Sequence, residues 1–175
     1  MTPMLMLRTV VATLAVIAVA DGHAQLPPTP DDKRYPELVA MKKWLESGMP
    51  QARHCAVSAG LFSEASEFYR ATRSEPATLE ELRRRHEATI PARDRTQLHS
   101  TLGHVVGMAA GFAALGEDSA TIAYSQLCIG RAKNPKAELA PAAIQARFNG
   151  ATKCEAAHPA GSLDRKECVA VAFRL

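Results

Sequence analysis

The chain has 175 residues, 47% of them hydrophobic and 22% charged, which is the balance of a globular protein rather than a disordered one. Its formal net charge of +3 is small for the strongly basic surface of a nucleic-acid-binding protein, so we expect no nucleic-acid partner. Apolar residues recur at helical spacing, and no segment has a convincing strand pattern. The sequence therefore predicts an all-α protein, a single compact helical domain of five to seven helices that is stapled by disulfides.

Residues 1–24 have the three-part layout of a secretory signal peptide. A short basic start precedes an uncharged apolar run over 9–20, and small residues then offer cleavage after Ala20 or Ala24. The apolar run is about 12 residues long, whereas a membrane-spanning helix needs ~20. We therefore expect a periplasmic or secreted protein with no stable membrane span after cleavage.

Residues 25–35 form a Pro-rich arm or linker, because three prolines and four charged residues follow one another there without any period. Residues 36–175 form the predicted helical domain. Its first two helices are expected over 36–47 and 51–73, where Gly48 and Pro50 supply the break between them.

Capping boxes predict the starts of three further helices, since a polar side chain at the first position and Glu or Gln three residues later can satisfy each other's backbone N–H groups. The three pairs are Thr78 with Glu81, Asp94 with Gln97, and Asp164 with Glu167. Another helix is expected over 119–133, and one over 134–149 that starts at Asn134 and Pro135 with a kink or restart at Pro141.

The four cysteines suggest disulfides, because an exported protein meets an oxidising compartment. Four cysteines allow three connectivities. We favour Cys154–Cys168, which closes a short loop, and Cys55–Cys128, which would tie two core helices together. No C-x-x-C pattern is present, which excludes a thioredoxin-like redox site and the attachment site of a c-type haem.

Three glycines recur at every fourth position within the helix predicted over 97–115, namely Gly103, Gly107 and Gly111. They lie in line on one helix face and leave it without side chains. We expect this helix-packing groove to be buried against the helix over 51–73 or the one over 119–133. A homodimer contact and a slot for a ligand are the alternatives.

His99, His104 and Met108 are the best candidates for metal ligands, although they are weak ones. His104 and Met108 are four residues apart and share a helix face, and imidazole with a thioether suits copper. His99 points well away from both, and His54 or His86 could join them only through folding. We therefore expect no haem, no tightly held metal and no other cofactor.

A cluster of basic side chains is a candidate docking patch for an acidic partner, an anionic lipid or a cell-wall polymer. The alternative is a solvated helix face on which the arginines pair with Glu80, Glu81 and Glu87. The basic residues are Arg83, Arg84, Arg85, Arg93 and Arg95.

No metalloprotease, nucleophile-elbow, P-loop or dinucleotide-binding motif is present, so an enzyme is the less favoured expectation. The leading hypothesis is a protein-binding or inhibitory module of the bacterial cell envelope, with an unidentified protein partner. One alternative is a carrier of a small ligand or metal that uses the glycine groove or the His and Met residues. The other is a cell-envelope hydrolase with a site assembled by folding.

Overall fold

The computed structural model describes residues 33–136 and 140–175, and within these ranges the chain is all helical and contains no strand. This confirms the predicted all-α, disulfide-stapled domain. The predicted leader and most of the Pro-rich arm lie outside the described residues. No helix in the described part of the chain is long and apolar enough to cross a membrane. The described ranges contain seven α-helices, which are α1 (Pro36–Leu45), α2 (Pro50–Thr72), α3 (Glu75–His86), α4 (Arg95–Gly111), α5 (Glu117–Lys133), α6 (Pro141–Ala157) and α7 (Leu163–Phe173).

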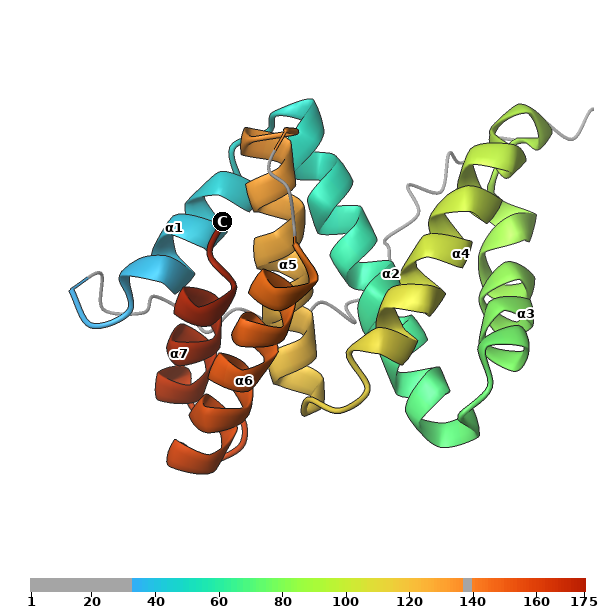
Figure 1. The fold of residues 1–175 in the computed structure, drawn as a ribbon. Helices are drawn as coiled ribbons and strands as arrows, with labels where there is room; N and C mark the ends of the chain where they lie inside the picture. The colour runs from blue at the N-terminus through green and yellow to red at the C-terminus, as the bar shows by residue number, and fades with distance from the viewer. Residues whose placement is uncertain (1–32, 137–139) are drawn as a thin grey trace, which may run out of the picture.

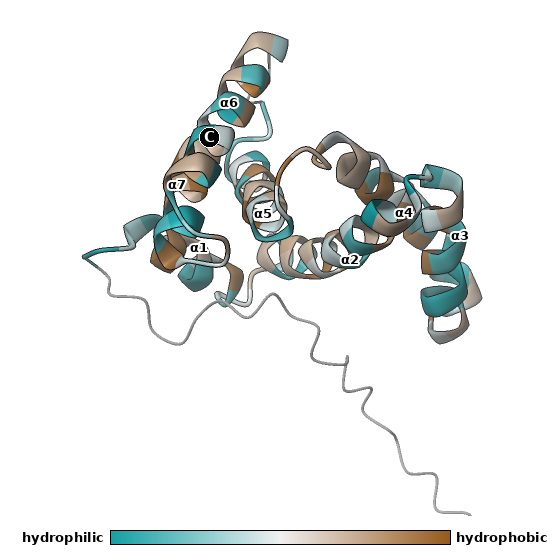
Figure 2. Ribbon diagram, turned by 90° about the horizontal axis from the view of Figure 1, so that it is seen from below, coloured by the Kyte–Doolittle hydropathy of each residue, from teal (hydrophilic) through white to brown (hydrophobic). Residues whose placement is uncertain are grey.

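Helix α2 is the element that the two sides of the domain share (Figure 1). On one side it packs against α3 and α4, which also pack against each other. On the other side it packs against α1 and α5, and α7 then joins α1, α5 and α6. Helices α4 and α5 both contact α2 but diverge from one another, as Figure 2 shows from below. This divergence leaves room above α2 between them.

The sequence around α2 explains both its start and its end. Pro50 occupies the first turn, where its missing N–H leaves no helical hydrogen bond unmade. Arg73 follows the last turn with φ of 54°, a left-handed conformation that stops the helix. The buried face of α2 includes Phe62 and Ala65, both with no exposed surface. Burial of a side chain as large as Phe62 stabilises the fold by about 1.5–3 kcal/mol.

None of the three predicted capping boxes forms, although Asp94 does lie at the predicted position directly before α4. At α3 and α7, serines that lie closer to the preceding breaks cap the helices instead. The Ser74 hydroxyl accepts the backbone N–H of Ala77 at 3.3 Å and begins α3. Thr78 is buried inside that helix, where its hydroxyl donates to the Ser74 carbonyl at 2.8 Å. Ser162 begins α7 in the same way, and Asp94 precedes α4 without making a side-chain cap.

Two helix boundaries also differ from the prediction. Helix α6 begins at Pro141, the predicted restart, and continues to Ala157. Helix α4 ends at Gly111 rather than at residue 115, because the following turn is held by a side chain from α2. The Arg70 guanidinium donates to the carbonyls of Ala113 and Leu115, at 3.3 and 2.5 Å. This turn carries Phe112 and Leu115 into the core.

Both favoured disulfides are present, and no cysteine is free. Cys55–Cys128 joins α2 to α5 across a sequence separation of 73, and Cys154–Cys168 joins α6 to α7 across a separation of 14. The first bridge thus links the shared helix to the C-terminal side of the domain. The second fixes the last two helices as a pair.

The first and last helices are joined by polar contacts. The backbone N–H groups of Glu37 and Leu38, at the start of α1, donate to the two carboxylate oxygens of Glu167 at 2.9 Å each. Arg174 adds an ion pair to the Glu37 carboxylate at 2.6 Å. The N-terminus of α1 is therefore capped by a side chain of α7.

Candidate functional site

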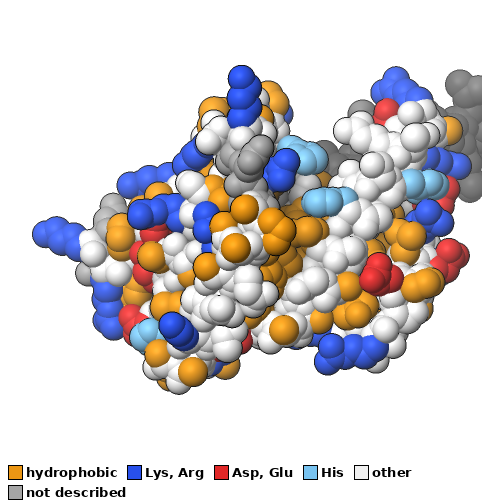
Figure 3. All heavy atoms as spheres, in the orientation of Figure 1, with side chains coloured by type: hydrophobic (Ala, Val, Ile, Leu, Met, Phe, Trp, Pro, Cys, Tyr) orange, Lys and Arg blue, Asp and Glu red, His pale blue; other side chains and the backbone are white. Residues whose placement is uncertain are grey.

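The divergence of α4 from α5 and α6 leaves a groove with α2 at its base, which we call the central groove. Its volume is about 980 Å³. Figure 3 shows hydrophobic side chains inside the hollow between α6 and α4. The lining residues come from four helices and are Pro50, Gln51, His54 and Cys55 of α2, His104, Met108 and Gly111 of α4 with the adjoining Phe112, Tyr124, Leu127, Cys128, Arg131 and Ala132 of α5, and Ile144 and Phe148 of α6.

Aromatic rings are concentrated at this groove. The whole chain has five Phe, three Tyr and one Trp, and Phe112, Tyr124 and Phe148 all lie on the lining. The Phe112 and Phe148 ring centroids are 4.9 Å apart, and Phe62 supports the group from below by stacking on Tyr124 at 4.4 Å. Phe112 and Tyr124 are buried in the hydrophobic core, whereas Phe148 is partly exposed, so the aromatic surface that the groove offers to an apolar molecule comes mainly from Phe148.

Burial further disfavours the ionised form of Tyr124. Its side chain is almost completely buried, and removal from water raises the pKa of the phenol, while a hydrogen bond with Ser58 lowers it in part. The neutral ring adds apolar surface to the groove and brings no negative charge into it.

Among the described residues that line the groove, the polar groups are basic or neutral and none is acidic. Gln51 and His54 lie in the first turns of α2 and Arg131 in the last turn of α5. The bridge between Cys55 and Cys128 brings these two helix ends together, so the three side chains lie toward the same end of the groove. No described residue forms a hydrogen bond or an ion pair with the His54 imidazole or the Arg131 guanidinium. This end can therefore receive a negatively charged group.

Folding brings together part of the predicted metal-ligand set. His104 and Met108 lie on the α4 wall of the groove, and His54 of α2 lines the same groove. His99 lies elsewhere, with its Nε2 atom 3.6 Å from the Glu87 carboxylate. Within the ranges that the structure describes, no three His, Cys, Asp or Glu residues are grouped so that they could hold a free metal ion.

The expected burial of the glycine face against another helix is wrong. A Cβ atom added at Gly103, Gly107 or Gly111 would meet nothing within 4 Å, and all three positions are exposed. The reason is that α4 turns its opposite face, with Leu102 and Val105, into the core. Of these three glycines, only Gly111 lines the central groove.

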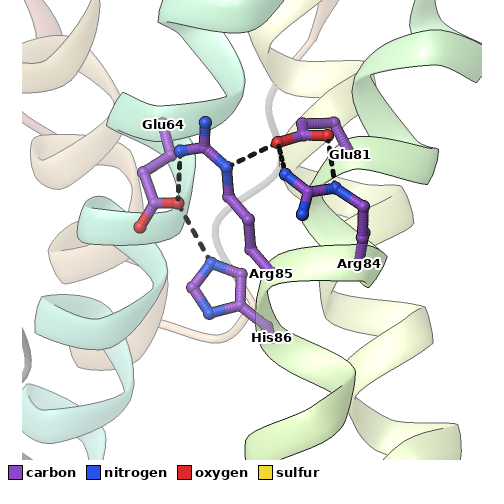
Figure 4. Close-up of polar contacts among 5 residues, drawn as sticks. All are labelled: Glu64, Glu81, Arg84, Arg85 and His86. Carbon is purple, nitrogen blue, oxygen red and sulfur yellow. Dashed lines mark hydrogen bonds and ion pairs between the residues drawn. The ribbon is translucent and has the colours of Figure 1, made fainter.

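The basic cluster is largely paired with acidic side chains. Arg84 and Arg85 both bind the Glu81 carboxylate, at 2.5 and 2.8 Å, and the Glu64 carboxylate lies 3.0 Å from His86 Nε2, as Figure 4 shows. The two arginine hydrogen bonds lower the pKa of Glu81 to about 2. These contacts favour the solvated, paired helix face over a free docking patch.

The remaining three arginines do not extend this cluster into one free basic surface. Arg93 lies 3.5 Å from the Asp94 carboxylate, and Arg95 lies 3.9 Å from that of Glu87. The Arg83 Nε atom is buried and has no hydrogen-bond partner among the described residues. The central groove is therefore the stronger candidate site.

Sequence reasoning missed most of this groove, because its lining comes from four helices that are far apart in the chain. The pair of His104 and Met108 was one available signal. The low aromatic content was another available signal, because in a chain with few aromatic residues each Phe or Tyr is more informative about a candidate site. A scan against protein-family models finds no match for this chain, and searches of curated proteins and of solved structures find none either.

Proposed function

We propose that this protein works outside the cytoplasm as a binding protein, and that it holds an apolar small molecule with a negatively charged group in the central groove. The observation that carries this proposal is the groove itself, about 980 Å³ in volume, apolar along its length and basic toward one end, with no acidic side chain among its described lining residues. Small-molecule sites span about 300–1,000 Å³ and combine apolar walls with a few polar groups.

The extracytoplasmic location is part of the same proposal. Its support is the signal-peptide layout of residues 1–24 and the two disulfides, which are typical of oxidising compartments. The Cys55–Cys128 bridge lies on the groove lining, so its formation is coupled to the spacing of α2 and α5.

A protein partner is the second proposal, and the open side of the same groove favours it. An amphipathic helix can place its apolar face in such a groove. We rank the small anionic ligand first, because the basic end of the groove near Arg131 can bind the one negatively charged group of such a molecule. A hydrolase has less support, because the described lining of the groove contains no carboxylate and both of its cysteines are bridged.

Fluorescence titration with a dye-labelled long-chain fatty acid tests the proposal, with its methyl ester as the uncharged counterpart. We expect saturable binding of both compounds to the purified protein, with the acid bound more tightly. Met108→Glu places a carboxylate on the groove wall and should weaken binding of the acid most. The matched control is Val57→Glu, since Val57 is 63% exposed on α2 and lies outside the groove.

Two results would contradict the proposed function. One is that neither probe binds to the correctly bridged protein. The other is that Met108→Glu and Val57→Glu bind the acid equally well, which would place the binding site elsewhere. Replacement of Arg131 by Gln gives a further check, because it should reduce the preference for the acid over the ester.

A further inference from the structure

We infer that the ligand class is a metalloporphyrin of the haem type, bound without a covalent link and held through its iron by His104. This inference rests on the proposed function and names the ligand of the same groove. The missing C-x-x-C-H motif excludes only covalent attachment, so it does not argue against a haem that is bound through its iron and its faces. The sequence-based expectation of no haem also depended on scattered histidines, and folding brings two of them to one groove.

The first support is the number of protein ligands that the iron requires. A free metal ion needs three or four protein ligands, and the described residues offer no such group of His, Cys, Asp or Glu. Haem iron already has four porphyrin nitrogens, so that a single imidazole can hold it. His104 supplies an imidazole on the groove wall, where no described side chain hydrogen-bonds to it.

The second support is the position of His104 among the aromatic residues. The centroids of its ring and the Tyr124 ring are 6.4 Å apart, and Tyr124 belongs to the cluster with Phe112 and Phe148. A porphyrin is a wide, flat, apolar ring system, and the partly exposed Phe148 ring with the edges of the buried Phe112 and Tyr124 rings gives it an apolar wall to contact. Met108 lies one helical turn after His104 on the same wall and adds a polarizable thioether to that surface.

The third support is the charge distribution along the groove. A haem carries two propionate carboxylates on one edge, and the groove has Arg131, His54 and Gln51 toward one end, with no acidic side chain among its described lining residues. The propionates would therefore lie at the end where α2 starts and α5 finishes. His54 belongs to this polar end, which is why we assign the iron to His104 instead.

The experiment is a titration of the purified protein, with both disulfides intact, by ferric haem and in parallel by iron-free protoporphyrin. The absorbance of the Soret band and the porphyrin fluorescence report the two affinities. We expect one haem per chain, a shifted Soret band, and weaker binding of the iron-free ring. In His104→Ala the haem affinity should fall by about tenfold or more, since even supporting contacts at a metal ligand are worth about 10–100-fold. The affinity for the iron-free ring should change little.

The control variant is His158→Ala, because His158 follows α6 and lies outside the groove lining. It should leave both affinities unchanged. His104 is exposed, so its replacement does not disturb the core, and a circular dichroism spectrum verifies the fold. Equal haem affinity in His104→Ala and the wild type would overturn the assignment, as would a loss of haem binding in His54→Ala alone.

The fatty-acid titration separates the two proposals. If the labelled acid binds in the groove and haem does not, the metalloporphyrin assignment fails and the proposed function stands. If neither compound binds, both fail.

Discussion

Phe62 of α2 stacks face to face on Tyr124 of α5, with ring centroids 4.4 Å apart and ring planes 8° from parallel. Phe62 has no exposed surface, whereas one side of Tyr124 lines the central groove. The stacked pair thus belongs to the hydrophobic core through one ring and to the groove through the other. Stability of the fold and shape of the groove are therefore linked at this point.

Replacement of Phe62 by Ala should lower both stability and ligand binding. Loss of a fully buried Phe costs about 3–5 kcal/mol, because it removes apolar contacts and leaves a cavity. Tyr124 would also lose its support and the groove its shape. Chemical denaturation measures the first effect and the fatty-acid titration the second. A change below about 1 kcal/mol would show that the stack does not hold α2 to α5.

Replacement of Gly107 by Ala should stabilise the protein by about 0.5–1 kcal/mol, since glycine weakens a helix interior and the added methyl group meets open space. Gly130→Ala is the matched change in α5, where the new Cβ would lie 2.5 Å from the Cβ of Leu175. The Gly130 variant should therefore be the less stable of the two. Thermal unfolding compares them, and a lowered midpoint for Gly107→Ala would argue that its face is covered.

The two disulfides should differ in their effect on stability and on the groove. On the loop-entropy model, the separation of 73 residues between Cys55 and Cys128 corresponds to about 4 kcal/mol, and the separation of 14 between Cys154 and Cys168 to about 3 kcal/mol. Paired Cys→Ala variants, studied by urea denaturation, test this order.

Ligand binding gives the disulfide variants a second measurement. Only the Cys55–Cys128 bridge lines the groove, so only its removal should weaken binding of the fatty acid. The Cys154–Cys168 variant is the control for general loosening of the fold. Equal losses of binding in both variants would contradict a specific role of the first bridge.

The Glu81 carboxyl group should titrate near pH 2. Hydrogen bonds from Arg84 and Arg85 favour its charged form and lower its pKa from 4.5 to about 2. Because the folded-state pKa lies below the ordinary value, the ion pairs stabilise the fold above about pH 4.5, and this contribution is lost as the pH falls toward 2. Carboxyl ¹³C NMR measures the titration. Arg84→Ala should raise the midpoint, whereas Arg83→Ala, which removes no bond to Glu81, should not.

The mature protein should begin at Asp21 or Gln25, because the small residues before each position suit signal peptidase. N-terminal sequencing of the protein from an envelope fraction measures this directly. Ala20→Arg together with Ala24→Arg should block processing, since both sites then lose their small side chain. An intact Met1 on wild-type protein in the cytosol would contradict export.

Helix content and disulfide pairing could be predicted from the sequence because they depend on local periodicity and on a short list of cysteines. Helix starts were harder to predict. Ser74 lies directly before Glu75 and Pro76, a good cap followed by a good first turn, yet the Thr78 and Glu81 pair satisfied a longer motif. A motif match cannot show that Thr78 is already inside the helix, where its hydroxyl bonds back to the Ser74 carbonyl.

The groove could not be predicted because its shape depends on how helices cross. The spacing of Gly103, Gly107 and Gly111 was read as a packing face, but helix periodicity alone does not tell which of two faces meets α2. The face that meets the core is the one that carries Leu102, Val105 and Val106, because these side chains are buried. His54 and His104 are 50 positions apart, and only the meeting of α2 with α4 places them on one groove.

The Glu167 carboxylate affects the order of folding as well as the final structure, because it caps a helix at the other end of the domain. A chain leaves the ribosome with its N-terminus first, so the bare N–H groups of Glu37 and Leu38 emerge long before the side chain that binds them, 130 residues after Glu37. Until α7 has followed, α1 can pack against α2 and α5 but lacks its cap and its contacts with α7. The first helix thus receives its cap from the last one, and a chain interrupted before residue 167 would leave the N-terminus of α1 uncapped. The cap on α1 can therefore form only after the chain has been synthesised as far as α7.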